Sequence, residues 1–293
     1  EKGLFLITDC KYLSRDQNAL RPVFEPRLRR KRLSAVRVEI FAIGSELCYG
    51  RVYDTNSFWI AEQVTKLGAV VKRITCIPDI VEEICAVLED ALSRRPHFMI
   101  LTGGLGPTSD DLTIEALSRL IGVEVVTHKE ILQIMAERRG VSVDDLPPNL
   151  LRMARSLKGA SCLPNPVGWA PVTIICCDET VIAALPGPPR EMKACFTEYL
   201  AGMIGEKTRY RSLAGRVLVT MYESQVSPIT KKIMESMPGV YLKPLVGEYD
   251  GERGLPVDIV VFAKDREECR ARMEEAVESF RRLVAQRGGS LKL

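Results

Sequence analysis

The residues best suited to chemistry lie in one short run, 102–113, which reads TGGLGPTSDDLT. Its three glycines, Gly103, Gly104 and Gly106, let the backbone approach a bulky anion, because glycine adopts positive φ angles at no steric cost. The run stands where a predicted strand ends and a predicted helix begins, so the free amides of the first helical turn can bind phosphate. The sequence therefore predicts a phosphorylated ligand at this loop.

Two acids, Asp110 and Asp111, follow the glycines in the same turn. They would repel a bare phosphate, and a divalent cation between the acids and the phosphate removes that conflict. Mg²⁺ is commonly held by one or two carboxylates together with phosphate oxygens and water. The alternative is structural, since Thr108 could cap the helix while the acids complement its dipole. The loop alone favours the metal only slightly.

Three further carboxylates, Glu46, Asp54 and Asp79, stand near the ends of predicted parallel strands. The carboxyl ends of parallel strands meet at one edge of a sheet, which is where ligands of such sheets bind. Capping of helices is an alternative account of Asp54 and Asp79 taken singly. Together with the glycine loop, the acids favour a site that binds a metal ion and a phosphate.

Strand and helix patterns alternate around these motifs, which predicts an α/β fold with a mostly parallel sheet and helices on both faces. Strands are predicted at 36–43, 70–77, 98–102, 172–177 and 180–185, and helices at 55–67, 80–93, 109–121, 128–139 and 189–201. These elements are assigned to one domain, 36–205.

The remaining residues, 206–293, predict a second, small α+β domain with the element order βαββα. Its strands are expected at 216–221, 240–245 and 257–262, and its helices at 226–237 and 266–287. The last helix alternates charges heavily, as a solvent-facing cover on a three-stranded sheet would.

Composition excludes several classes of protein. With 293 residues, 46% hydrophobic and 27% charged, the chain has the make-up of a globular protein. Its apolar runs are too short to cross a bilayer. Nine cysteines without a CxxC pair indicate reduced thiols in the cytoplasm, and only two histidines exclude a His-rich metal centre.

The first 35 residues differ from the rest. Residues 1–37 hold ten Lys and Arg against four Asp and Glu, and no regular period appears before Val36. Such a basic run is more often a solvated, disordered tail than a nucleic-acid site. We expect 1–35 to be such a tail or to precede the true start of the protein, and we leave it out of the fold.

Taken together, the motifs resemble the CinA-like competence/damage-inducible proteins, whose N-terminal domain has the molybdopterin-binding fold. The resemblance implies a three-layer α/β/α domain that binds a pterin or nucleotide phosphate beside Gly103 and Gly104. It spans about 37–200, with a second domain after it, and rests on these residues: Gly44-Ser45-Glu46-Leu47, Gly50, Asp54-Thr55-Asn56-Ser57, Asp79, Thr102 to Thr113, Asn165, Gly168, Ala170, Leu185-Pro186-Gly187-Pro188-Pro189 and Glu191-Met192.

The same resemblance implies an activity. Members of that family are associated with divalent-metal-dependent hydrolysis of the pyrophosphate of ADP-ribose-like dinucleotides, and a related domain occurs beside FAD synthase modules. Relatives in molybdenum cofactor biosynthesis bind or adenylylate molybdopterin with acids that match Asp79 and Asp111. The nicotinamide mononucleotide deamidase domain of longer CinA proteins is not expected, because the chain stops after the small domain. Trp169 stands where members tend to have a small residue, so the pocket is expected to differ in shape.

The resulting prediction is a nucleotide pyrophosphatase that acts on ADP-ribose-like or FAD-like dinucleotides. Asp79, Asp110 and Asp111 are its predicted catalytic residues and the ligands of Mg²⁺, Mn²⁺ or Co²⁺. The predicted phosphate and ligand contacts are Ser45, Glu46, Asn56, Gly103, Gly104, Gly106, Thr108, Asn165 and Gly187. Two alternatives stay open: molybdopterin binding or adenylylation, and a non-catalytic binding module. A homodimer or other homo-oligomer is expected, without a membrane partner.

Overall fold

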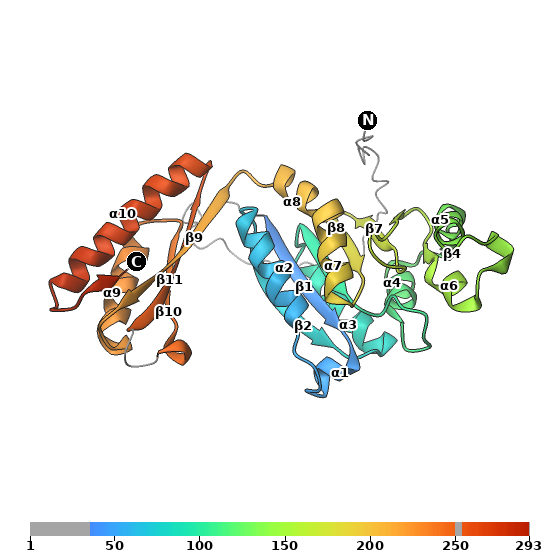
Figure 1. Ribbon diagram of the computed structural model, residues 1–293, viewed down its shortest axis with the longest axis horizontal. Coiled ribbons are helices and arrows are strands. Elements are labelled where there is room, and N and C mark those ends of the chain that lie inside the picture. Colours follow the sequence, from blue (N-terminus) through green and yellow to red (C-terminus); the bar gives the residue numbers. More distant parts are fainter. Residues whose placement is uncertain (1–35, 250–253, 293) are drawn as a thin grey trace, which may run out of the picture. The chain divides into compact units, whose positions relative to one another are not determined.

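The computed structural model describes residues 36–249 and 254–292, so the predicted basic tail 1–35 lies outside the described residues. The chain forms two compact units (Figure 1). The first holds the described residues up to Val64 together with Val70–Met203, and the second holds Thr65–Ala69 and the residues from Ile204 onward.

A six-stranded sheet forms the centre of the first unit, in the order β2-β1-β3-β8-β7-β6. Neighbours from β2 to β8 are parallel, while β7 runs antiparallel to both β8 and β6. This mostly parallel arrangement confirms the predicted α/β fold. The strands are β1 (Arg37–Ile43), β2 (Val70–Ile77), β3 (Phe98–Thr102), β6 (Ser161–Leu163), β7 (Val172–Cys177) and β8 (Thr180–Leu185).

Helices cover the sheet because its central strands are buried on both faces. Every residue of β3 and β8 is buried, and such unbroken apolar runs are typical of strands with helices on both sides. On one face, helices α3 (Val81–Ser93) and α4 (Thr113–Ile121) share a core with Phe41 and Leu101. Helices α2 and α7 are drawn side by side in front of the sheet in Figure 1. Trp59 of α2 packs edge to face on Phe196, which directly follows α7, with 5.5 Å between the ring centroids. The helices not yet given bounds are α1 (Ser45–Cys48), α2 (Thr55–Lys66), α7 (Pro189–Cys195), the π-helix η2 (Phe196–Leu200) and α8 (Ala201–Lys207).

A small lobe is inserted between α4 and β6, and it has an apolar cluster of its own. Ile131, Met135, Leu146 and Leu150 are buried there. Its two short strands pair antiparallel and were not predicted, because three residues are too few to show a period. The lobe comprises β4 (Val125–Thr127), α5 (Lys129–Arg139), the 3-10 helix η1 (Val143–Asp145), α6 (Pro148–Met153) and β5 (Arg155–Leu157).

One predicted boundary is wrong at the glycine loop. Helix α4 begins at Thr113, whereas the sequence predicted a start at 109. The turn at 108–111 is closed instead by the carboxylate of Asp111, which accepts hydrogen bonds from the amide and the hydroxyl of Thr108. Asp and Thr side chains compete in this way with the helical pattern of backbone bonds. Asp110 and Asp111 therefore lie in a turn before the helix.

The second unit is a four-stranded antiparallel sheet, in the order β10-β11-β9-β12, with two helices. The predicted three-stranded sheet was one strand short, because β12 has only two residues and shows no pattern. Ala276, Phe280 and Val284 of the last helix are buried in the core of this unit. Its elements are β9 (Arg211–Val219), α9 (Glu223–Ser236), β10 (Val240–Pro244), the 3-10 helix η3 (Val246–Glu248), β11 (Leu255–Ala263), α10 (Arg266–Ala285) and β12 (Leu291–Lys292).

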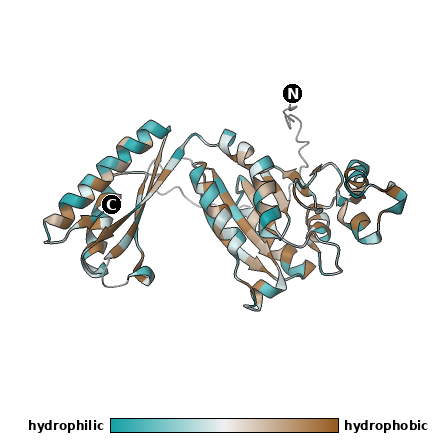
Figure 2. Ribbon diagram, viewed as in Figure 1, coloured by the Kyte–Doolittle hydropathy of each residue, from teal (hydrophilic) through white to brown (hydrophobic). Residues whose placement is uncertain are grey.

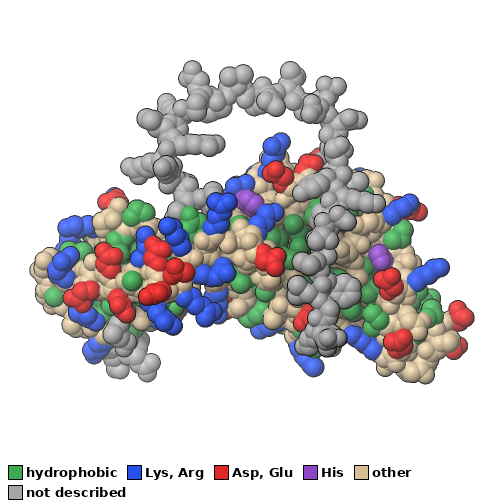
Figure 3. Space-filling view, turned by 90° about the horizontal axis from the view of Figure 1, so that it is seen from above, with side chains coloured by type: hydrophobic (Ala, Val, Ile, Leu, Met, Phe, Trp, Pro, Cys, Tyr) green, Lys and Arg blue, Asp and Glu red, His purple; other side chains and the backbone are tan. Residues whose placement is uncertain are grey.

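Hydropathy and charge follow this layering. Figure 2 shows the strands of the first unit as mostly hydrophobic, while the helices carry hydrophilic outer faces. On the face drawn in Figure 3, basic and acidic side chains are intermixed over the described surface. None of the helices in the described part of the chain is both long and apolar enough to cross a membrane.

One buried carboxylate lies in β1, an inner strand of the sheet. Glu39 is 2% exposed, and its oxygens accept hydrogen bonds from Arg94 at 2.9 and 2.6 Å and from Arg73 at 3.1 Å. We predict that Glu39→Ala lowers the free energy of unfolding by about 3 kcal/mol, because it leaves the partly buried Arg94 with the exposed Asp90 as its remaining ion-pair partner.

The exposed pair of Glu124 and Lys158, 3.2 Å apart, supplies the control. When both variants are unfolded with urea, Glu124→Ala should lower the free energy of unfolding by less than about 0.5 kcal/mol. Equal losses of stability in the two variants would contradict the prediction.

Candidate functional site

The glycine loop lies wedged between the ends of neighbouring strands. Gly103 has φ +96°, and a Cβ atom there would lie 2.2 Å from the carbonyl oxygen of Ile43. Its amide donates to the carbonyl of Leu185 at 3.1 Å. Gly104 has φ +64°, and a Cβ atom there would lie 2.3 Å from the Thr113 hydroxyl. Neither position has room for a side chain, so the packing of the loop against its own neighbours requires glycine at both.

Thr113 fixes the loop to the start of α4. Its hydroxyl donates to the carbonyl oxygen of Gly103 at 2.8 Å, and its amide donates to that of Gly104 at 3.1 Å. Thr113 is fully buried, so these bonds are shielded from water. The loop is therefore held in one conformation before any ligand arrives.

The two acids of the loop carry different roles in the local structure. Asp111 closes the turn with one oxygen, which accepts the Thr108 amide at 2.8 Å and the Thr108 hydroxyl at 2.6 Å. Asp110 is exposed, and Thr108 and the positive charge of Arg152 hold its pKa below the ordinary value. Asp110 is thus ionised at neutral pH.

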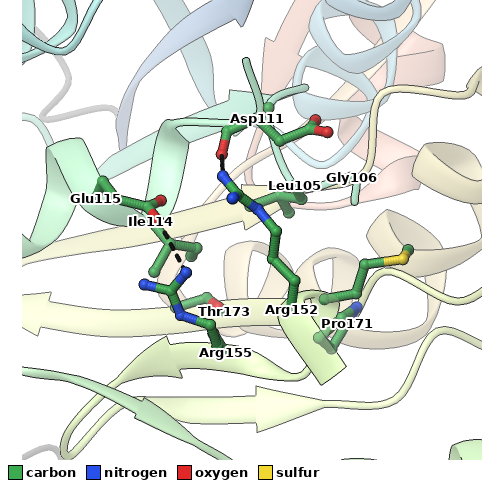
Figure 4. A pocket seen from close by; sticks show the side chains of 11 residues that line it. Leu105, Gly106, Asp111, Ile114, Glu115, Arg152, Arg155, Pro171 and Thr173 are labelled. Atoms are coloured by element: carbon green, nitrogen blue, oxygen red, sulfur yellow. Dashed lines mark hydrogen bonds and ion pairs between the residues drawn. The ribbon is translucent and has the colours of Figure 1, made fainter. Parts of the chain in front are cut away.

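A small cavity of about 20 Å³ adjoins the loop on the side of the lobe. Figure 4 shows Arg152 reaching the main-chain oxygen of Asp111, at 3.4 Å, while the Asp111 carboxylate points away from it. Beside it, Arg155 pairs with Glu115 at 3.1 Å. These arginines support the loop from the lobe, and the Asp111 carboxylate stays free of an ion pair with them.

Asp79 and Ser45 cap each other at the next strand end. The Ser45 amide donates to the Asp79 carboxylate at 2.7 Å, and the Asp79 amide donates to the Ser45 hydroxyl at 3.1 Å. Asp54 caps α2 in a similar way by accepting the Ser57 amide at 2.9 Å. The capping alternative given above therefore holds for Asp54. Asp79 does not cap the helix that follows it, since the N-cap of α3 is Ile80, and it bonds instead to the first residue of α1. Both carboxylates keep further lone pairs for a ligand.

Asn56 and Gly187, predicted from separate motifs, meet directly. The Asn56 side-chain amide donates to the Gly187 carbonyl at 2.7 Å. This bond fixes the orientation of the amide, since only its nitrogen can face a carbonyl oxygen. Its Oδ1 atom is buried and has no hydrogen-bond partner within the described residues. Asn56 thus lines the cavity, while its nitrogen bonds to Gly187 and its buried oxygen keeps an unused acceptor position.

These elements surround a cavity of about 690 Å³, within the range of sites that bind small molecules. Nine of the predicted site residues line it: Glu46, Asn56, Asp79, Gly103, Gly104, Gly106, Asp110, Asp111 and Gly187. Ser45 and Thr108 do not line the cavity, but they donate hydrogen bonds to Asp79 and Asp111. Asn165 is 1% exposed and bonds only to the protein, through contacts described below.

The charge of this lining is strongly one-sided. Six carboxylates line the cavity, and the lining holds a single guanidinium, that of Arg139. The effect reaches Cys48, whose pKa is raised by partial burial and by the charges of Asp79 and Glu46. The carboxylates are Glu46, Asp54, Asp79, Asp110, Asp111 and Glu191.

A metal would have to share its coordination with the ligand. Among the described residues, no group of three or more His, Cys, Asp or Glu side chains is arranged to hold a metal ion. The predicted set of Asp79, Asp110 and Asp111 is thus not a closed site, although all three line one cavity. One or two carboxylates with phosphate oxygens and water would suffice for Mg²⁺.

Several lining residues were not predicted as site residues. Trp169, Leu150 and Met153 form part of the cavity wall beside the lobe, and Tyr53 and Arg139 also line it. They come from loops and from the inserted lobe, whose placement no strand-end argument predicts. Among these residues, only Trp169 stood out in the sequence, because it lies where members of the family that the sequence resembles tend to have a small residue.

Comparison with known proteins now identifies the family. The model of the protein family described as "Probable molybdopterin binding domain" matches residues 39–206 of this chain. The chain belongs to this family. A crystal structure of CinA from Thermoplasma acidophilum, a protein of unknown function, aligns with a TM-score of 0.54 and 30% identity, covering 58% of this chain and 98% of CinA. The predicted resemblance to CinA-like proteins is confirmed.

Relatives of this molybdopterin-binding-family chain extend over both units. A protein of Pyrobaculum arsenaticum is 34% identical over 254 residues, which are 86% of this chain and 96% of the relative. A protein of Pyrococcus furiosus is 35% identical over 247 residues, or 80% of this chain and 94% of the relative.

The close contacts of the loop predict an unequal response to two glycine substitutions. Gly103→Ala should lower the free energy of unfolding by at least about 3 kcal/mol, because its Cβ would overlap the Ile43 carbonyl. Gly122 also has a positive φ, +74°, but no atom lies within 4 Å of its Cβ position. Gly122→Ala should therefore cost only about 1 kcal/mol. Equal losses in urea denaturation would show that the loop has room to move.

Proposed function

We propose that this protein hydrolyses the pyrophosphate bond of an ADP-ribose-like or FAD-like dinucleotide with the help of a divalent cation. The observation that carries the proposal is the cavity lining, in which six carboxylates and one arginine surround a glycine loop. The loop suits a phosphate, and the acids suit a cation that would offset their repulsion of it. Binding of phosphate and cation together would account for both features of the lining.

The residues divide the proposed work among them. Backbone amides of Gly104 and Gly106 would donate to phosphate oxygens and stabilise charge that develops on them, whereas the Gly103 amide is already bonded to Leu185. Asp79 and Asp111, with Asp110 beside them, would hold the cation through the carboxylate oxygens that local hydrogen bonds leave over. A bound cation would polarise the phosphoryl group and lower the pKa of a water molecule. Asn56 would accept a hydrogen bond from the sugar or base once a shift of the side chain uncovers its buried, unpartnered oxygen.

A second function has an observation of its own. Asp79 and Asp111 already accept hydrogen bonds from Ser45 and Thr108, as they would in a site that only binds. Together with the family match, this favours a site for molybdopterin or another phosphorylated pterin, which is bound or adenylylated there. This second function requires the glycines, and in it the acids serve mainly to accept hydrogen bonds from the protein's own loops.

Release of AMP distinguishes the two functions. We expect the purified protein to release AMP from at least one of ADP-ribose, FAD and NAD with Mg²⁺, Mn²⁺ or Co²⁺, and to stop when chelator is added. The double substitution Asp79→Asn/Asp111→Asn should lower this rate at least about 100-fold, because it removes two metal-binding charges. The asparagine oxygens can still accept from Ser45 and Thr108, so the loops should keep their shape.

The matched control replaces an acid outside the cavity. Asp144 lies exposed in η1 and does not line the pocket, so Asp144→Asn should leave the rate within about twofold. If all three dinucleotides stay intact while a phosphorylated ligand raises the melting temperature, hydrolysis is wrong and the binding function stands. Product that forms only with ATP and molybdopterin would indicate adenylylation.

A further inference from the structure

Trp169 forms part of the cavity wall next to the inserted lobe. It lines the cavity and is half-buried. It also packs against the apolar cluster of the lobe, which includes Leu150. Leu150 and Met153 line the cavity next to it. The lobe therefore gives the cavity an aromatic and apolar end, in contrast to the acids and glycines at the strand ends.

A network of hydrogen bonds fixes the loop that carries Trp169. The Nη1 atom of Arg138 donates to the carbonyl oxygens of Asn165 and Gly168 at 2.7 and 2.8 Å. The Asn165 Oδ1 atom accepts the amides of Val167 and Gly168 at 3.0 and 2.8 Å. Arg138 thus ties the loop to α5. Both the amide and the carbonyl of Gly168, the residue before Trp169, are hydrogen-bonded.

The far side of the loop is held as firmly. The Asn165 Nδ2 atom donates to the Ala170 carbonyl at 3.0 Å and to the Glu191 carboxylate at 2.6 Å. A Cβ atom on Gly168 would come within 2.1 Å of that carboxylate, so Glu191 lies directly against the loop backbone. All four hydrogen-bonding positions of the Asn165 amide are used. Asn165 is therefore a positioning residue that fixes the backbone on both sides of Trp169, while the Trp169 side chain packs against the apolar cluster of the lobe.

We propose that the indole of Trp169 stacks on a planar heteroaromatic ring of the ligand. The site would then select phosphate compounds that carry such a ring over sugar phosphates that lack one. Stacking on an aromatic side chain tolerates different bases, because every base offers a π face. This inference rests on the proposed function only for the position of the phosphate at the glycine loop.

The test measures binding of ligands that have no pyrophosphate bond to hydrolyse. AMP and FMN each join a planar ring to a phosphate, and ribose 5-phosphate is the probe without a ring. By calorimetry with Mg²⁺, the full chain should bind AMP or FMN at least about 5-fold more tightly than ribose 5-phosphate. Trp169→Leu keeps an apolar contact with the lobe but removes the ring, and should weaken that binding about 5- to 100-fold. Trp169→Phe should restore it to within about 3-fold of the original.

The affinity for ribose 5-phosphate should stay within about twofold in both variants, since the phosphate end is untouched. The chain has two tryptophans, so a Trp59→Phe background assigns any ligand-induced change in fluorescence to Trp169. The inference is overturned if the unchanged protein binds AMP and FMN no more tightly than ribose 5-phosphate, or if Trp169→Leu weakens all three equally. Failure of hydrolysis with ring-dependent binding intact would overturn only the proposed function.

Discussion

The close approach of Gly103 to the ends of β1 and β8 is the constraint on which the site depends. A side chain at this position would overlap the Ile43 carbonyl, and the Gly103 amide is bonded to Leu185. The loop can therefore sit only at the carboxyl edge of the parallel strands, where Asp79 and Asn56 also lie. The position of the loop in turn fixes where α4 can begin, because Thr113 bonds back to both glycines. Packing at one strand end thus decides the geometry of the whole cavity.

The cavity combines two requirements that conflict in the absence of a ligand. Backbone amides at the loop favour an anion, while the surrounding carboxylates repel it. Local hydrogen bonds to Ser45 and Thr108 lower the cost of keeping Asp79 and Asp111 close to the loop. A cation that binds with the phosphate would satisfy both requirements at once, and this accounts for a site whose acids do not form a closed metal cage.

Sequence reasoning found the parts of the site that strand ends position, and missed those that the inserted lobe brings in. Asp79 and Gly103 were found because parallel strands must deliver their last residues to one edge, and Asn56 was found through the motif 54–57 of the family resemblance. The start of α4 was placed too early because a side-chain bond between Thr108 and Asp111 replaced the first helical turn. Asn165 was recognised as important, but its amide is used entirely within the protein. No pattern in the sequence states whether an amide faces a ligand or its own loop, since that depends on tertiary contacts with α5 and α7.

The most direct test of the account is a crystal structure of the protein with ADP-ribose and Mn²⁺, with the metal located from its anomalous scattering. The account predicts phosphate oxygens on the amides of Gly104 and Gly106, with Mn²⁺ between the phosphate and the carboxylates of Asp79 and Asp111. The aromatic ring of the ligand should lie against Trp169. A phosphate bound away from the glycine loop, or a phosphate on the loop with no metal at these acids, would contradict it.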